Sequence, residues 1–171
     1  MKVPCATGLP SADECALIQL LSASGSGATG AGNVNAYYVA IPQPVPIGKH
    51  WVVLNAFGIK ADPIAQADIS VIDGLYIFPQ TSLQGSSGTI LAGAADPSDF
   101  QRKIISLGGV LLPTEFVNQN SNMNSQTMNI PWCIIPSGFV LAYVYVPQAG
   151  AGVCQGYMGI TYFQRDNPKC S

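Results

Sequence analysis

From residue 35 onward, the chain is a series of short apolar segments separated by proline, glycine and asparagine. Segments rich in β-branched and aromatic residues and bounded by turn residues are typical of β-strands. The expected strands are residues 37–41, 51–59, 68–78, 101–112, 127–135, 138–146 and 153–163. No amphipathic helical period of useful length follows residue 22, which disfavours an α/β fold. We therefore expect one all-β domain over residues 35–171, a β-sandwich or jelly roll.

Glycines mark irregular points in two of these expected strands. Gly74, which follows Asp73, indicates a bend in strand 68–78 or its division into two strands. Gly108 and Gly109 lie inside strand 101–112, where they predict a β-bulge.

The expected strand 138–146 is apolar on both faces, unlike a strand with one solvated face. One face carries Phe139, Leu141, Tyr143 and Tyr145, and the other carries only aliphatic residues. One face is expected to join the core, and the other then needs a second layer. A neighbouring subunit is the natural second layer, with Tyr143 and Tyr145 as the candidate subunit contacts.

The first 34 residues differ in composition from the rest of the chain. Residues 1–21 are expected to form an N-terminal arm, because Ser11 to Glu14 has the form of a capping box at the start of a short helix. A helix from Ala12 to about Leu21 is too short to be stable alone. Its candidate docking residues are Leu17, Leu20 and Leu21. Glycine, serine and alanine dominate residues 22–34, which predicts a flexible linker.

Charged residues make up only 9% of the chain, where about 25% is typical. A protein with so few charges hides much of its surface in an assembly or relies on amide and hydroxyl groups for hydration. The seven basic residues form no stripe that could neutralise phosphates, so nucleic-acid binding is excluded. No apolar run reaches the roughly 18 residues of a membrane span. Asp13 and Glu14 interrupt any export signal, so synthesis in the cytosol without a standard export signal is expected.

Five cysteines are present, and their spacing matches no zinc site because the chain has no C-x-x-C motif and only one histidine. They are Cys5, Cys15, Cys133, Cys154 and Cys170. Two interpretations stay open: buried free thiols, or two disulfides in which Cys5 pairs with Cys15 and Cys133 with Cys154. In the second interpretation Cys170 is free or pairs between chains.

His50 is the one candidate base, and it lies between Lys49 and Trp51 at the start of an expected strand. A serine or cysteine nucleophile would need this base, and no G-x-S-x-G elbow accompanies it. A hydrolase would instead need converging carboxylates, and the candidates are Asp68, Asp73, Asp96, Asp99 and Glu115. Asp96 to Asp99 is more simply a turn. We expect no enzyme, no cofactor and no metal site.

Trp51 and Trp132 raise the alternative of carbohydrate binding, because exposed tryptophans stack on sugar rings in carbohydrate-binding modules. Both are flanked by apolar strand residues, which favours core positions instead. The asparagine-rich run 118–124 is expected to be an exposed loop.

Two segments share one pattern, an aliphatic residue, proline, any residue and glycine, followed at once by an apolar strand. They are residues 45–53 and 135–143, and we interpret them as equivalent openings into the two sheets. Through these openers, residues 35–165 resemble small jelly-roll virion proteins of tailed bacteriophages. That group includes decoration (cement), head-fibre and neck or tail accessory proteins.

The resemblance implies a structural protein of the virion with no catalytic residues. Its partners would be copies of itself, with a trimer favoured, and other virion proteins such as the major capsid protein. Capsid decoration or stabilisation is the expected function. The alternative is a carbohydrate- or receptor-binding module.

Overall fold

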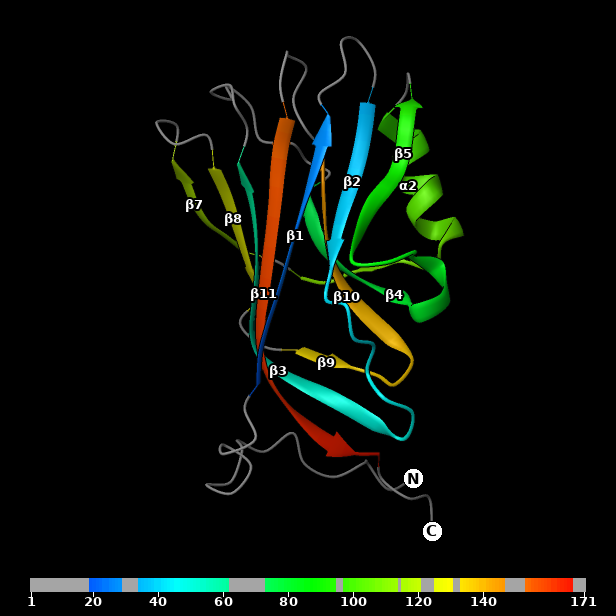
Figure 1. Cartoon of the computed structure of the whole chain (residues 1–171), viewed down its shortest axis with the longest axis vertical. Coiled ribbons are helices and arrows are strands. Elements are labelled where there is room, and N and C mark those ends of the chain that lie inside the picture. The colour runs from blue at the N-terminus through cyan, green and yellow to red at the C-terminus, as the bar shows by residue number, and fades with distance from the viewer. Residues whose placement is uncertain are drawn as a thin grey trace.

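The computed structural model describes residues 19–28, 34–61, 73–94, 97–113, 115–120, 125–130, 133–146 and 153–167. Within these ranges the chain forms two antiparallel β-sheets, one α-helix and one short 3₁₀ helix (Figure 1). The all-β prediction is confirmed at this level. None of the described helices is long and apolar enough to cross a membrane.

The first sheet has the strand order β1-β11-β3-β8-β7, and β9 also pairs with β3. Its strands are β1 (Gln19–Ala28), β11 (Val153–Asp166), β3 (Lys49–Ala61), β8 (Ser125–Ile130), β7 (Glu115–Asn120) and β9 (Cys133–Ile135). The long pair of β3 and β11 forms the centre of this sheet, with one irregularity of register between Thr161 and Tyr162.

The second sheet has the strand order β5-β2-β10-β4-β6. Its strands are β5 (Ser87–Ala94), β2 (Val34–Ala40), β10 (Phe139–Tyr145), β4 (Gly74–Pro79) and β6 (Val110–Leu111). The 3₁₀ helix η1 (Gln80–Ser82) follows β4, and the helix α2 (Pro97–Ser106) lies beside β5 (Figure 1).

The two shared openers do lead into the two sheets. Gly48 precedes β3 of the first sheet and Gly138 precedes β10 of the second, and both have a φ of 78°. This left-handed conformation favours glycine, which explains the residue at both turns. The two turns also lie side by side, because Val45 donates to the carbonyl of Phe139 and accepts from the amide of Gly138, each at 2.9 Å.

The main core lies between the two sheets and draws side chains from both. It contains Val39, Ile41, Val45, Trp51, Val53, Leu75, Ile77, Ile135, Leu141, Tyr143, Tyr145, Met158, Ile160 and Tyr162, among others. The ring centroids of Trp51 and Tyr162 are 4.1 Å apart. Trp51 is 1% exposed, which confirms the core position favoured by the sequence.

Two glycines of the first sheet make room for the two tyrosines of β10. A Cβ atom on Gly58 of β3 would lie less than 3.0 Å from the ring of Tyr143, and one on Gly156 of β11 would lie as close to the ring of Tyr145. The two rings are stacked, with centroids 5.6 Å apart and 20° between their planes. At both contacts, a ring from the second sheet therefore packs directly against bare backbone of the first.

This packing corrects the expected role of Tyr143 and Tyr145 as subunit contacts. Both are 0% exposed in the core of their own chain. The opposite face of β10, with Val140, Ala142 and Val144, packs in a second cluster that contains Phe100 and Ile104 of α2. The second layer that the apolar strand needs is thus supplied by a helix of the same chain.

The expected strand 101–112 is wrong over most of its length, since residues 97–106 form α2 and only Val110 and Leu111 form a strand. Pro97 stands at the first helical position, where its missing N–H is no loss, and Asp99 lies in the first turn. Phe100 and Ile104, four residues apart, share the buried face of α2.

Gly108 and Gly109 end this helix and form no bulge. The amide of Gly108 donates to the carbonyl of Ile105, and that of Gly109 donates to Ile104, both at 2.9 Å. With a φ of 70° at Gly108, these bonds make a Schellman motif, the common glycine cap of a helix C-terminus.

Residues 19–28 form strand β1, where the sequence predicts the end of a helix and the start of a flexible linker. The strand pairs with β11 over its whole length, from Gln19 opposite Tyr162 to Ala28 opposite Val153. The edge of β11 offers hydrogen bonds to the backbone of any segment, and composition alone does not reveal this partner. The rest of the expected arm and linker lies outside the described residues.

Candidate interaction surface and other sites

An apolar groove of about 290 Å³ lies between α2 and β6. Its main lining residues are Tyr76, Phe100, Ile104, Ile105 and Leu111. The groove forms because α2 packs one face on the second sheet, while β6 joins the neighbouring edge of that sheet after the turn at Gly108. The floor is buried core, and the rim is open to solvent.

Two large aliphatic side chains of the lining are exposed at this rim. Ile105 is 74% exposed and Leu111 is 56% exposed. Val110 is 53% exposed, but it alternates with Leu111 along β6 and pairs with Ile77, so it lies on the other face of the sheet. Ile105 follows the buried Ile104, so it lies on the side of α2 that turns away from the sheet. Contiguous exposed apolar residues around a groove mark an interaction site on a folded protein.

β6 also forms an edge of the second sheet. It pairs with β4 through Leu111 opposite Tyr76 and Val110 opposite Ile77, and in the described part of the chain it has no strand on its other side. An edge of this kind presents backbone donors and acceptors to another chain. The groove and the edge together can bind an apolar protein surface.

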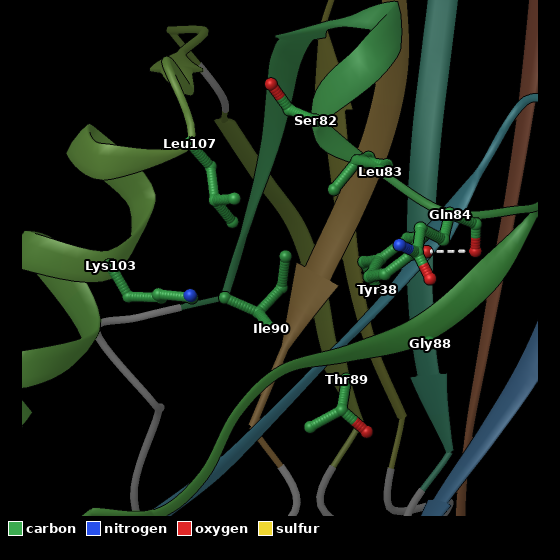
Figure 2. A pocket seen from close by; sticks show the side chains of 9 residues that line it. All are labelled: Tyr38, Ser82, Leu83, Gln84, Gly88, Thr89, Ile90, Lys103 and Leu107. Atoms are coloured by element: carbon green, nitrogen blue, oxygen red, sulfur yellow. Dashed lines mark hydrogen bonds between the residues drawn. The ribbon is translucent and has the colours of Figure 1, made fainter.

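A second hollow, of about 330 Å³, lies on the β5 side of α2 (Figure 2). Lys103 and Leu107 reach it from the end of α2, and Ile90 and Thr89 reach it from β5. Tyr38 donates a hydrogen bond of 2.6 Å to the carbonyl of Gln84. Burial raises the pKa of Tyr38 and outweighs the opposing effect of this bond. The hydroxyl of Tyr38 is therefore protonated and acts as a hydrogen-bond donor.

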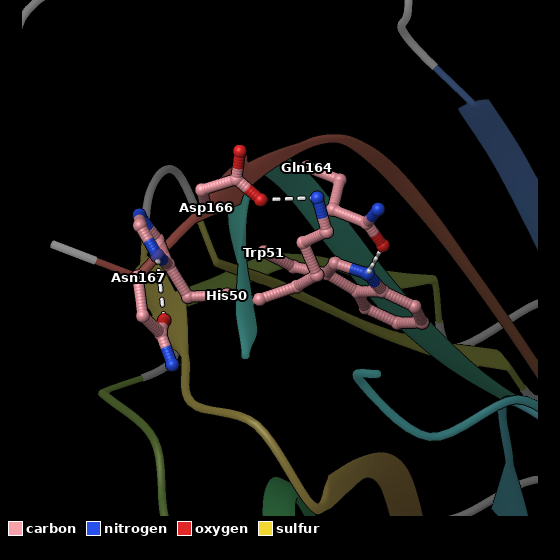
Figure 3. Close-up of polar contacts among 6 residues, drawn as sticks. His50, Trp51, Gln164, Asp166 and Asn167 are labelled. Carbon is pink, nitrogen blue, oxygen red and sulfur yellow. Dashed lines mark hydrogen bonds and ion pairs between the residues drawn. The ribbon is translucent and has the colours of Figure 1, made fainter. Parts of the chain in front are cut away.

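His50 lies in a polar cluster at the ends of β3 and β11 (Figure 3). Its Nδ1 is 3.1 Å from Oδ1 of Asn167, and the neighbouring Lys49 pairs with Asp166. Trp51, on the buried side, donates from Nε1 to Oε1 of Gln164 at 3.3 Å. The described contact of the histidine is with the amide of Asn167, which in turn donates from Nδ2 to Oγ of Ser137 at 3.2 Å.

The candidate hydrolase carboxylates are not brought together as a described pair. Asp73 is buried against Lys60, and Asp99 pairs with Arg102 on α2 at 3.1 Å. Glu115 begins β7, but its side chain is outside the description, as are Asp68 and Asp96 entirely. Among the described residues, no three histidine, cysteine or acidic side chains cluster to hold a metal ion. The absence of enzyme activity stays a prediction.

The burial of Trp51 excludes it as a sugar-stacking residue, and Trp132 lies outside the described residues. Of the candidate docking leucines, Leu20 and Leu21 belong to β1, opposite Thr161 and Ile160, while Leu17 is outside the description. Asn118 to Asn120 lie in strand β7 instead of a loop.

Cys133 is a half-buried free thiol in β9, and burial raises its pKa to about 11. For Cys133 this agrees with the interpretation as a free thiol, and the alternative bond with Cys154 is wrong. On β3, the partner of Cys133 is Val53. Cys154 directly precedes Gln155, whose partner on β3 is Ala61. Val53 and Ala61 are eight residues apart along β3, or about 26 Å, far beyond the roughly 7 Å limit for a disulfide. Cys5, Cys15 and Cys170 lie outside the described residues.

The groove beside β6 was not predictable from the sequence, because it needs α2 to be a helix and β6 to be an edge. The only sequence signal was the apolar run at residues 104–112, which we interpreted as part of a strand. Comparison with protein family models, with curated proteins and with solved structures finds no match for this chain.

Proposed function

We propose that this chain is a structural virion protein of a tailed bacteriophage, which decorates or stabilises the capsid by self-association and lattice binding. The observation that carries the proposal is the apolar groove beside the β6 edge, with Ile105 and Leu111 exposed at its rim. Its partners would be further copies of the chain, with a trimer favoured, and other virion proteins such as the major capsid protein.

The proposed architecture is a jelly roll, and the strand order supports it. We number β1, β2, β3, β4, β6, β8, β10 and β11 from one to eight in chain order. One sheet then runs 1-8-3-6 and the other runs 2-7-4-5. Successive strands alternate between sheets except where the fourth leads to the fifth, as in the two Greek keys of a jelly roll. Viral capsid proteins use this fold, as do lectins and cupins, so fold alone does not select the function.

The surface chemistry favours assembly among these functions. With 9% charged residues, the chain has few groups that keep copies apart in solution. Covering one large aliphatic side chain contributes about 1.5–3 kcal/mol, so the two at this rim give a partner a substantial apolar contact. The sugar-binding alternative loses support, since Trp51 is inside the core.

Substitution of the rim tests this proposal. The double variant Ile105→Lys and Leu111→Lys places two charges in the apolar contact, and we expect sedimentation velocity to show a shift from oligomer to monomer. Ile47→Lys is the matched control, because Ile47 is 86% exposed on the connection between β2 and β3. That variant should sediment like the wild type. An unchanged oligomer in the double variant would contradict the role of this surface.

A further inference from the structure

Lys60 and Asp73 form an ion pair inside the fold. Their side chains are 1% and 0% exposed, and Lys60 Nζ lies 2.7 Å from Asp73 Oδ2. Lys60 belongs to β3 of the first sheet, and Asp73 directly precedes β4 of the second. Such a pair is costly, because both ions lose their hydration when they are buried.

The backbone of Val146, just after β10, orients both groups. Its amide donates to Oδ1 of Asp73 at 2.8 Å, and its carbonyl accepts from Nζ of Lys60 at 3.0 Å. One carboxylate oxygen is therefore held by an N–H group while the other faces the amine. An N–H donor in this place stabilises the negative charge that develops on Oδ1 when a nucleophile attacks the carboxyl carbon.

We propose that Lys60 and Asp73 condense to form an intramolecular isopeptide bond. A proton first passes from the ammonium group to Oδ2, which leaves a neutral amine beside a carboxylic acid. The Nζ lone pair then forms a C–N bond with Cγ, and the Cγ–Oδ2 bond breaks. Oδ2 leaves as water, carrying the transferred proton and a second proton from Nζ. No oxidant, metal ion or further reactant is needed.

Burial and proximity both favour this reaction. The condensation replaces two buried charges with one neutral amide, which removes the desolvation cost of the ion pair. The fixed contact also makes the step unimolecular, and well-oriented groups of this kind gain effective molarities of about 10⁵–10⁸ M. Burial, followed by the effect of Asp73, raises the pKa of Tyr76 to about 12, so the nearby phenol stays neutral.

The bond would join β3 of one sheet to the residue that leads into β4 of the other. A covalent link between the sheets resists their separation, which suits a protein under mechanical stress. The inference rests on the geometry of the pair and does not depend on the proposed self-association.

Intact mass under denaturing and reducing conditions tests the proposal. We expect the wild-type chain to be lighter than its sequence by one water, about 18 Da. Lys60→Arg keeps a positive charge, but a guanidinium group is a poor nucleophile, so this variant should have its full mass. A wild-type chain with its full mass would overturn the proposal.

Peptide mapping provides the second measurement, because Asp73–Gly74 can also lose water by cyclising to a succinimide without any lysine. A protease digest of the wild type should contain one branched peptide that joins Lys60 to Asp73. A mass loss that persists in Lys60→Arg, with no branched peptide in the wild type, would identify the succinimide and reject the isopeptide bond.

Discussion

Gly156→Ala is expected to lower the free energy of unfolding by about 3 kcal/mol, the upper part of the range for overpacking a core. The new methyl group would meet the ring of Tyr145, which is 0% exposed and stacked on Tyr143. Neither ring has free space to move into, so the two sheets must separate locally. Gly58→Ala should have an effect of similar size, because its methyl group would meet Tyr143.

Chemical denaturation of these variants measures the loss. Gly88→Ala is the graded comparison, since its Cβ would lie 2.9 Å from Tyr38 at a partly exposed position, and we expect a smaller loss there. Combining Gly156→Ala with Tyr145→Leu should cost less than the sum of the single variants, because the smaller side chain relieves the clash. Additive losses would show that the ring and the glycine are not in contact.

Trp51→Ala is expected to destabilise the fold by about 3–5 kcal/mol, as is usual when a large buried aromatic side chain is truncated. Trp51 is 1% exposed, makes a tilted ring contact with Tyr162 and donates its indole N–H to the side chain of Gln164. The variant loses buried apolar area, a ring contact and a hydrogen bond together.

Thermal unfolding monitored by circular dichroism measures this effect, and Trp51→Phe should lose clearly less than Trp51→Ala. Gln164→Leu is the control for the hydrogen bond alone, which contributes about 1 kcal/mol. A soluble Trp51→Ala variant with unchanged melting temperature would contradict the core position. Such a result would also indicate that Trp51 lies at the surface.

Strands with strong local signals were predictable from the sequence. The segments 51–59, 138–146 and 153–163 lie within or largely coincide with β3, β10 and β11. Each combines many β-branched or aromatic residues with clear turn signals, and two begin with a proline–glycine opener. Local chemistry at Gly48 and Gly138 requires the same turn in any surrounding fold.

Elements that depend on a distant partner were not predictable. Strand β1 has the composition of a linker and is held by the edge of β11, more than 120 residues later in the chain. Helix α2 is only ten residues long, and its apolar face packs in a cluster with residues of β2, β4, β5 and β10. Because the sequence did not predict this helix, the second apolar face of β10 was expected to need a neighbouring subunit. In the structure, α2 packs on that face instead.

The candidate surface also depends on elements held by distant partners, and its position was not predictable from the sequence. From the low charge, the sequence predicts that part of the surface is covered in an assembly, and it placed the subunit contact on Tyr143 and Tyr145. The exposed aliphatic residues instead gather where α2 and β6 meet, two elements absent from the strand prediction. Their exposure depends on which face of α2 is already buried.

Light scattering behind size exclusion, over a range of protein concentrations, tests the proposed self-association most directly. We expect a mass that is a multiple of the 17.9 kDa chain, with three copies favoured, in reducing buffer as well as oxidising buffer. The contact is apolar, so high salt should leave the oligomer intact. A mass of one chain at every concentration would contradict it.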